Sequence, residues 1–387
     1  MRNCHRAKLS ILISQCSNTE KITDMEKERY ITLSSYGKGA HERVIKDDKY
    51  PVPFLGYRVK SGQFIYSRID ARNGAYGIIP PELDGYVVSK DFPVYDIDAK
   101  KVLPRFLLRS VLSIEFINQV KRSSFGATNR MRIKEEVFEN YSIPLPPLAE
   151  QRRIVAVLDK VGKLLDQHKQ QLALLDDLIK ARFVEMFGNP IDNPRRWPLR
   201  QLGELGCWSS GGTPARSNPS YFLGDIDWYS AGELNSLFLH GSSEKITRDA
   251  IDNSAAKLFD AGSMLVGMYD TAAFKMGILR NAASCNQACA CITPNDLVDL
   301  VWLYHMLQAM KNHFLSLRHG VRQKNLNLGM IKEFTIPVPD KAQQLKFSAF
   351  VAQVDKSKFL YLLQYSRVIF PCRQGFCTPD GVLCDQF

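Results

Sequence analysis

Two short segments of the chain combine basic, amide and small polar side chains in a way that suits contact with nucleic acid. One is Tyr66–Gly74, with Arg68, Arg72 and Asn73, and the other is Arg318–Asn325. Arginine can bond guanine edges with both arms, asparagine can bond adenine, and lysine or serine can bond phosphate. Either segment could instead be a solvated loop. The expected contact residues of these segments and their neighbours are Arg58, Lys60, Arg68, Arg72, Asn73, Arg322, Gln323, Lys324 and Asn325.

The charge of the chain agrees with a polyanionic partner. Its 387 residues carry a formal net charge of +11, with an isoelectric point near 9.1. A basic protein is drawn to nucleic acid or to an anionic membrane surface. However, no apolar run reaches the roughly 18 residues that cross a bilayer, and the patch Leu9–Ile13 is too short for a signal peptide. Nine cysteines, an odd number, favour reduced thiols. We therefore expect a cytoplasmic protein without a membrane partner.

Enzymatic and metal-binding alternatives have weaker support. Asn218–Tyr221 resembles the Asn-Pro-Pro-Tyr loop of adenine-N6 methyltransferases, but its third residue is serine and no glycine-rich donor loop follows a strand upstream. Tyr36–Gly39 lacks the remainder of a phosphate-binding loop. Cys285, Cys289 and Cys291 do not have the spacing of a zinc site. We expect no catalytic residue and no metal ligand in this chain.

A long-range repeat defines the organisation of the sequence. Ile143–Gln151 returns as Ile336–Gln344, 193 positions later. Each copy ends a region of short β-rich runs and opens a helix, which predicts two domain-plus-helix units in tandem rather than a solenoid. The two basic segments are then expected at comparable places in the two repeats. Within the first region, the predicted elements are strands at Tyr30–Leu33, Gly62–Tyr66, Tyr76–Ile79 and Gly85–Val88, and a helix at Pro104–Gln119.

The helix that begins at Leu148 carries a coiled-coil seam. Apolar residues recur at alternating spacings of four and three, with His168 as a polar member, and continue through Arg182 and Met186. Gly188 and Pro190 end the pattern. About 39 residues give a rod of roughly 58 Å, whose seam needs a partner helix, and the second copy is the natural one. The expected packing residues are Ile154, Leu158, Val161, Leu165, Leu172, Leu175 and Ile179, with Phe347, Val351 and Val354 on the second helix.

Several motifs together identify a family. They are the proline-rich run Ile143–Val155, Trp197–Leu199 followed by Gly211–Pro214, Gln323–Leu328, and Tyr30–Gly39. In this combination, over roughly residues 7–365, the chain resembles the specificity (S) subunit of type I restriction–modification systems. Lys38 and Thr213 lie within these motifs and join the expected DNA contacts.

The resemblance implies a DNA-reading subunit without catalysis of its own. Each target recognition domain would read one half of a bipartite site in double-stranded DNA. The two helices would pack antiparallel, act as a spacer and dock two methyltransferase (M) subunits, and restriction (R) subunits would join for cleavage. S-adenosylmethionine, ATP and Mg²⁺ are expected only on these partners. A DNA adenine methyltransferase and a basic coiled-coil scaffold remain the alternative functions.

The expected fold is α+β, with two tandem recognition domains of mixed α/β structure and twisted sheets, separated by long antiparallel coiled-coil helices. Three departures from the family are expected. The distal helix is predicted to run only about 25 residues before Pro371, and the cysteine-bearing tail differs from the helical ending usual in the family. The first domain is expected to lack its opening strand. The predicted boundaries are 1–145 for the first domain, 146–190 for the central helix, 191–338 for the second domain, 339–370 for the distal helix and 371–387 for a poorly ordered tail.

Overall fold

The computed structural model describes residues 5–47, 49–125, 132–317 and 325–375, the last 14 of these by their backbone alone. The chain divides into two compact units. The first contains Met1–His168 with Leu363–Phe387, and the second contains Lys169–Leu362. Both long helices, α5 (Leu148–Phe187) and α9 (Lys341–Gly375), contribute residues to both units.

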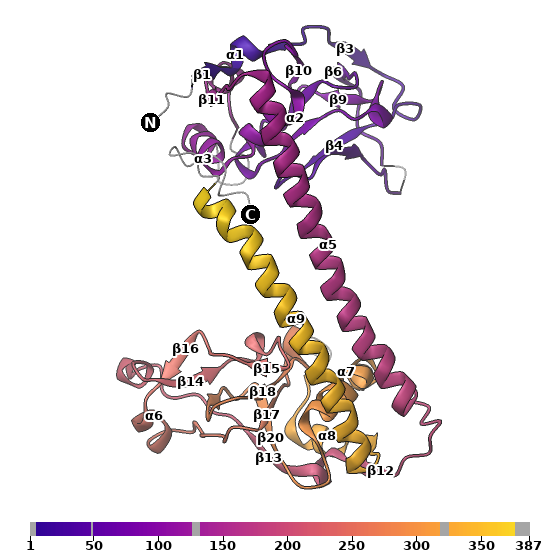
Figure 1. Ribbon diagram of the computed structural model, residues 1–387, viewed down its shortest axis with the longest axis vertical. Helices are drawn as coiled ribbons and strands as arrows, with labels where there is room; N and C mark the ends of the chain where they lie inside the picture. The colour runs from indigo at the N-terminus through magenta and orange to yellow at the C-terminus, as the bar shows by residue number, and fades with distance from the viewer. Residues whose placement is uncertain (1–4, 48, 126–131, 318–324, 376–387) are drawn as a thin grey trace. The chain divides into compact units, whose positions relative to one another are not determined.

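The first unit is built on a four-stranded sheet in the order β2-β10-β7-β8. Figure 1 labels β10 of this sheet and the neighbouring strands β3, β6, β9 and β4. A three-stranded sheet, β3-β6-β9, and the hairpin β4-β5 lie beyond it, and β1 pairs with β11. The predicted strands near residues 31, 64, 76 and 87 are all present. The strand bounds are β1 Arg6–Lys8, β2 Ile13–Gln15, β3 Glu20–Ile22, β4 Ile31–Ser34, β5 Gly39–Glu42, β6 Phe54–Arg58, β7 Phe64–Tyr66, β8 Tyr76–Ile78, β9 Val87–Ser89, β10 Val94–Ile97 and β11 Ser142–Pro144.

The prediction of one continuous helix at Pro104–Gln119 is wrong, because two separate helices occupy this segment. The side chain of Ser113 accepts a hydrogen bond from the backbone N–H of Phe116 and so caps a new helix. These helices and the first turns of α5 cover an aromatic core in which Tyr66 stacks on Phe138 with ring centroids 4.1 Å apart. The helices of this unit are α1 Leu9–Leu12, α2 Pro104–Val111, α3 Ile114–Ser123 and α4 Glu135–Glu139.

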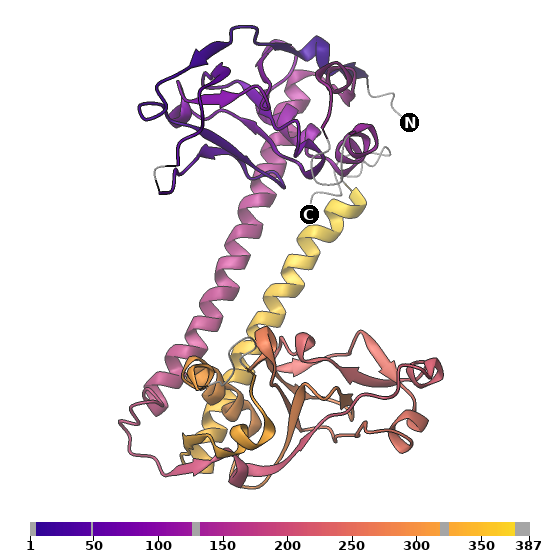
Figure 2. The ribbon, with the colours of Figure 1, turned by 180° about the vertical axis from the view of Figure 1, so that it is seen from behind.

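The second unit repeats this plan with a five-stranded sheet, β13-β20-β17-β18-β15, and a three-stranded sheet, β16-β14-β19. Figure 1 labels the five strands of the larger sheet, and Figure 2 shows the same unit from behind. β12 pairs with β21. The strand bounds are β12 Leu199–Gln201, β13 Gly206–Ser210, β14 Ile226–Tyr229, β15 Phe238–Leu239, β16 Glu244–Ile246, β17 Met264–Gly267, β18 Met276–Leu279, β19 Ser284–Cys285, β20 Cys289–Pro294 and β21 Thr335–Pro337, and the helices are α6 Arg248–Asp252, α7 Leu300–Ser316 and α8 Leu328–Glu333.

The large sheet of the second unit is buried on both faces. Along β17, Met264 and Val266 belong to the core shared with α5, α7 and α9, whereas Leu265 belongs to a second core on the opposite face. Successive side chains of a strand point to opposite faces, so a strand covered on both sides is apolar throughout. This explains why Met264–Gly267 reads as a continuous apolar run without alternation.

The same pairing of an opening strand with a closing strand occurs in both units. β1 pairs with β11 through Ala7 opposite Ile143, and β12 pairs with β21 through Arg200 opposite Ile336. Arg200 follows Ala7 by 193 positions, and Ile336 follows Ile143 by the same 193 positions, which is the spacing of the sequence repeat. The expectation that the first domain lacks its opening strand is therefore wrong, because β1 is that strand; at three residues it is too short to show a periodic pattern.

A buried glutamine ties each long helix to its domain. The side-chain oxygen of Gln151 accepts from the N–H of Leu103 (2.9 Å), and its amide donates to the carbonyls of Lys101 (3.0 Å) and Pro146 (2.8 Å). In the second unit, Gln344 accepts from the N–H of Asp299 (2.7 Å) and donates to two equivalent carbonyls, those of Leu297 (3.0 Å) and Pro339 (2.9 Å). Both side chains are 0% exposed. The repeated proline-rich motif thus places the same three-bond clamp at the start of both helices.

The central helix begins at the predicted Leu148 and ends just before Gly188, inside the predicted range 146–190, and the distal helix is longer than expected. α5 contains 40 residues and α9 contains 35, passing through Pro371 to Gly375. A proline inside a helix removes one hydrogen bond and strains the preceding turn, but it does not always end the helix. The predicted end at residue 370 is therefore wrong. Residues 376–387 of the predicted tail lie outside the described residues.

In the second unit α5 and α9 run antiparallel. The ring of Phe183 packs edge-on against Phe347 (centroids 5.4 Å apart), and farther along the helices Asp176 pairs with Lys358 (2.7 Å). Ile179, Phe347, Val351 and Val354 lie in the same buried core, with Leu175 packed against it and Leu172 half-buried.

The seam departs from its expected heptad positions near the end of α5. Phe183 and Phe187 are buried there, whereas Arg182 and Met186 are only partly buried. A straight α-helix has 3.6 residues per turn and drifts relative to a 3.5-residue repeat, so the buried stripe moves by one position. Of the seam residues in the first unit, Leu158, Val161 and Leu165 are buried, and Ile154 packs against the core beneath the large sheet.

A cavity of about 730 Å³ lies between α5, α7, α9 and the loop before β15. His305 on α7 lines it, and its Nε2 is buried without a hydrogen-bond partner. Burial lowers the pKa of His305 to about 4, with the nearby ammonium of Lys358 acting in the same direction and Asp176 in the opposite one. The imidazole is therefore neutral at pH 7. Among the described residues, no helix is long and apolar enough to cross a membrane.

Replacing Gln344 with methionine should destabilise the second unit by roughly 3 kcal/mol, because one buried N–H and two carbonyls lose their partner. The amide of Asp299 should also exchange with solvent deuterium faster than in the parent. Gln343→Met, at the neighbouring half-exposed position, is the matched control and should leave both the unfolding free energy and that exchange rate near the parent values. Equal stability of the two variants would show that the clamp does not stabilise the fold.

The second unit should lose stability as the pH falls from about 6.5 towards 4. His305 has a lowered pKa in the folded chain, so its contribution is complete above the unfolded pKa and is lost, at up to about 1.4 kcal/mol per pH unit, on acidification. His305→Gln should flatten the dependence of the melting temperature on pH between 7 and 5. His313→Gln, an exposed site on the same helix, should keep the parent slope; equal slopes for both variants would contradict the assignment.

Candidate nucleic-acid interface

In both units the same end of the large sheet collects loops with polar side chains. In the first unit, Tyr66 of β7, Tyr76 of β8 and Val94 of β10 lie at this end. The turn between β7 and β8 carries Arg68, Arg72 and Asn73, the last two within a short 3₁₀ helix, η1 (Ala71–Asn73). We call the loops at this end of each large sheet the strand-end surface. In the first unit it comprises Arg68–Gly74, Lys90, Asp91, Arg132 and the hairpin tip Tyr36–Lys38.

The tip of the β4-β5 hairpin is fixed to this turn. The N–H of Tyr36 donates to the carbonyl of Asn73 (2.7 Å), and the N–H of Gly37 donates to the carbonyl of Gly74 (3.0 Å). Lys38 follows directly, is exposed, and forms no ion pair with any residue that the structure describes. The structure thus brings Lys38 together with Arg72 and Asn73, although more than 30 residues separate them in sequence. Tyr36, 82% exposed, was missed by the sequence analysis as a candidate contact.

Arg68 is engaged inside the protein. Its guanidinium forms an ion pair with Glu135, the first residue of α4, and its carbonyl accepts from the N–H of Ile133 (3.1 Å). Arg132 in turn pairs with Asp91 (3.1 Å). These bonds fasten the segment that enters α4 to the strand-end surface. Arg68 is half-buried, so its described contacts support a positioning role for this side chain.

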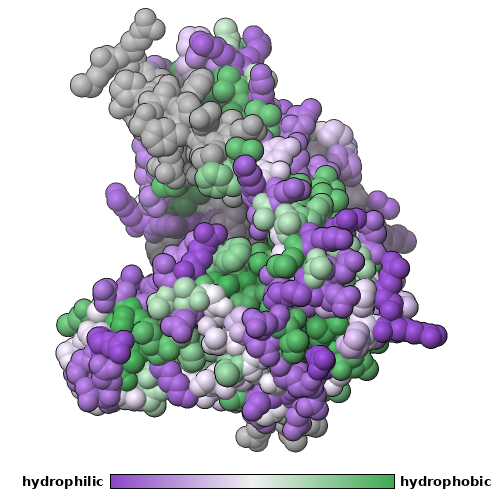
Figure 3. All heavy atoms as spheres, turned by 60° about the horizontal axis from the view of Figure 1, so that its bottom comes forward, coloured by the Kyte–Doolittle hydropathy of each residue, from purple (hydrophilic) through white to green (hydrophobic). Residues whose placement is uncertain are grey.

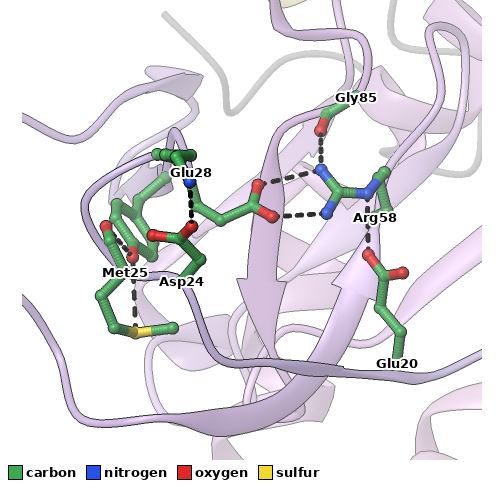
Figure 4. Close-up of polar contacts among 8 residues, drawn as sticks. Glu20, Asp24, Met25, Glu28, Arg58 and Gly85 are labelled. Carbon is green, nitrogen blue, oxygen red and sulfur yellow. Dashed lines mark hydrogen bonds and ion pairs between the residues drawn. The ribbon is translucent and has the colours of Figure 1, made fainter.

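Arg58 and Lys60 do not join the strand-end surface. Arg58 lies on β6 in the smaller sheet, where its guanidinium bonds both oxygens of Glu28 (2.7 and 2.9 Å), the carboxylate of Glu20 (2.7 Å) and the carbonyl of Gly85 (2.8 Å) (Figure 4). Hydrogen bonding to Arg58 holds the pKa of Glu28 below its usual range. A DNA phosphate would have to displace these carboxylates. Lys60 is exposed, but it precedes β7 and so lies at the opposite end of the large sheet.

In the second unit the strand-end surface is built from loops at Thr213, Tyr269, Gln287 and Asn325. Ser210 of β13 pairs with Ala290 of β20, and Gly267 of β17 pairs with Cys289, so their loops emerge together. The hydroxyl of Thr213 donates to the side-chain oxygen of Gln287. Gln287 and Tyr269 are exposed, and Thr213 and Asn325 are half-buried. Of the predicted contacts, Arg322, Gln323 and Lys324 lie outside the described residues.

The two basic segments do not occupy comparable places, which corrects the expectation from sequence. The N–H of Arg68 donates to the carbonyl of Asp91 (2.9 Å), as that of Met268 donates to Ala288 (2.8 Å). The carbonyls of the same two residues accept from Ile133 and from Leu326 (2.9 Å). The counterpart of Arg68–Asn73 is therefore Met268–Ala273, and Asn325, which precedes Leu326, corresponds to Arg132, which precedes Ile133. Sequence spacing could not show this, because the turns share no residue pattern.

The exposed face of the second unit has a mixed character. Figure 3 shows apolar residues in several separate patches among hydrophilic ones on the visible face.

Cys285, Cys289 and Cys291 lie in the core between the two sheets, and burial raises the pKa of the Cys291 thiol to about 12. In the part of the chain that the structure describes, histidine, cysteine and acidic side chains do not assemble into a group that could hold a metal ion. The chemistry of the site is hydrogen bonding and charge.

Comparison with known families identifies the two units. The family model described as the type I restriction modification DNA specificity domain matches twice, over residues 17–176 and 194–360. The chain belongs to this type I restriction specificity family. Most of the first match lies in the first unit and all of the second lies in the second unit, and each match includes residues of one long helix. The chain therefore contains two tandem copies of the specificity domain.

Relatives within the specificity family are distant in sequence. The specificity subunit of the Escherichia coli type I restriction enzyme EcoR124I/EcoR124II is 25% identical over 246 residues, covering 57% of this chain and 58% of that subunit. The HindI specificity subunit of Haemophilus influenzae is 22% identical, covering 73% and 78%. The crystal structure of a type I restriction–modification S subunit from M. genitalium has a TM-score of 0.56 at 13% identity, covering 100% and 97%. This likeness supports the α+β fold with tandem recognition domains.

Proposed function

We propose that this chain is the DNA-specificity subunit of a type I restriction–modification complex and has no catalysis of its own. Each unit reads one half of a bipartite site in double-stranded DNA through its strand-end surface. The helices α5 and α9 set the spacing between the half-sites and dock the methyltransferase subunits. The observation that carries the proposal is the double match to a DNA specificity domain, one match for each unit.

Electrostatics and geometry support the same function. The net charge of +11 favours a polyanion. Lys38 is an exposed cation held on a fixed hairpin, and Arg72, Asn73, Thr213 and Asn325 lie on the same type of surface in the two units. Side chains on a rigid sheet end lose little freedom on binding, which favours selective contacts. Arg322, Gln323 and Lys324 stay predicted contacts, whereas Lys60 lies at the end of the sheet opposite the proposed interface.

The partners follow from this assignment. We expect two methyltransferase subunits on the helices and restriction subunits in the complete complex. S-adenosylmethionine, ATP and Mg²⁺ would belong to those partners, and the chain itself would bind none of them. The complex would act on DNA in the cytoplasm. A chain that bound S-adenosylmethionine alone, or that bound DNA without any sequence preference, would favour the methyltransferase or the scaffold alternative.

DNA binding by the chain should weaken steeply with salt, since each neutralised phosphate adds about 0.9 to the slope of log affinity against log salt. Lys38→Ala should reduce that slope by about one. Lys100→Ala, an exposed lysine beyond the opposite end of β10, is the matched control and should keep the parent slope. Fluorescence anisotropy of a labelled duplex between 50 and about 200 mM salt measures it. A flat dependence for the parent chain would contradict phosphate contact.

Inserting one heptad into both α5 and α9 should lengthen the spacer between half-sites by about three base pairs. Seven residues add about 10 Å of helix, against 3.4 Å per base pair, and a heptad preserves the seam. The readout is genome-wide adenine methylation with the methyltransferase subunit present. Insertion into α5 alone is the control, and it should abolish bipartite recognition because the seam loses its partner. An unchanged spacer after the paired insertion would show that the helices do not set the distance.

A further inference from the structure

Gln287 is an exposed amide in a turn whose neighbouring residues are hydrogen-bonded to two strands. It lies in the turn between β19 and β20, where the N–H of Asn286 donates to Tyr229 (2.9 Å) and the side chain of Asn286 accepts from the N–H of Ala288 (3.1 Å). The carbonyl of Ala288 accepts from Met268 (2.8 Å), which joins the turn to β17. The position of the Gln287 backbone is therefore fixed from both sides.

Thr213 orients the Gln287 side chain. Its hydroxyl donates to the side-chain oxygen of Gln287. Within the described part of the chain, the amide N–H groups and the second lone pair of that oxygen stay available. Backbone hydrogen bonds fix the chain just before Thr213. The N–H of Gly211 donates to the backbone carbonyl of Cys289 (3.0 Å), and the N–H of Gly212 donates to the backbone carbonyl of Cys285 (2.9 Å). A Cβ on Gly212 would lie 1.9 Å from the carbonyl oxygen of Ala255. Only glycine allows this close approach.

The result is a carboxamide with a donor and an acceptor side by side on the strand-end surface of the second unit. Adenine presents a matching pair in the major groove, the N7 acceptor and the N6 donor, and glutamine can bond both. Part of the rotamer entropy that a free glutamine would lose on binding is already lost in the hydrogen bond to Thr213.

The first unit has a different residue at the equivalent position. The backbone carbonyl of Asp91 accepts from the N–H of Arg68, as the backbone carbonyl of Ala288 accepts from the N–H of Met268. Lys90, which precedes Asp91 and is exposed, therefore corresponds to Gln287, which precedes Ala288. Lysine offers only donors, which suit guanine or phosphate and not the adenine pair. The same place in the two folds thus carries different recognition chemistry, as two unlike half-sites require.

We propose that Gln287 reads an adenine in the half-site of the second unit and that Thr213 is the residue that positions it. This inference rests on the proposed DNA-specificity function. It assigns one base position to one side chain, and it gives the Gly211-Gly212-Thr213 segment the role of holding that side chain in its reading orientation.

The test is selection of bound duplexes from a randomised library by the full chain with its methyltransferase subunits. Gln287→Ala should relax one adenine position of the second half-site by roughly 5- to 150-fold, the discrimination that one paired contact provides. Gln287→Lys should move the preference there towards guanine. Asn281→Ala, an exposed amide beyond the opposite end of β18, is the matched control and should leave both half-sites unchanged.

The positioning role has its own readout. Thr213→Val should weaken the same adenine preference, and Thr213→Ser, which restores the hydroxyl, should recover it, with equal melting temperatures for the two variants. If the parent chain selects a bipartite motif and Gln287→Ala leaves every position of it unchanged, the inference is wrong while the proposed function stands. If the parent selects no motif at all, the proposed function itself fails.

Discussion

Each recognition unit depends on one buried glutamine at the start of a long helix. Gln151 and Gln344 are fully buried, and each makes three hydrogen bonds to backbone groups. Because unpaired backbone groups in an interior cost about 1–3 kcal/mol each, the loop before α2 or α7 and the first turn of the long helix must form together. The clamp therefore makes the helix a continuation of the domain, as the spacer role proposed for the helices requires.

The common frame leaves the surface free to differ. Where Gly74 has a positive φ of 73° in the first unit, Phe274 has one of 55° in the second. A phenylalanine in this conformation is strained by roughly 1–2 kcal/mol, but its ring stacks on Phe314 with centroids 5.3 Å apart and is fully buried. Packing thus compensates for the backbone strain. The same turn can carry Arg72 and Asn73 in one unit and apolar anchors in the other without a change of sheet register.

Much of the architecture follows from periodicity and repetition. The motif repeat predicted two units, and the heptad pattern predicted α5 almost to its ends. The β-rich runs located β7 and β8 of the first large sheet and β4 and β9 beyond it. The errors arose where local signals were weak. β1 is too short to show a period, Ser113 divides a continuous apolar pattern into two helices, and Pro371 does not end α9. The buried stripe at Phe183 and Phe187 moved because helix geometry, not the heptad, fixes which side faces the core.

The sequence by itself determined the two units, the long helices and the family, because each of these is written in local patterns that recur along the chain. Only the tertiary structure decided which polar side chains are available. Arg58 pairs with Glu28, 30 residues away, Arg68 with Glu135, 67 away, and Thr213 with Gln287, 74 away. The way strands and loops meet in space determines such partners. A charged or amide side chain can therefore be paired or oriented by a residue far away in sequence, and no sequence spacing predicts that residue.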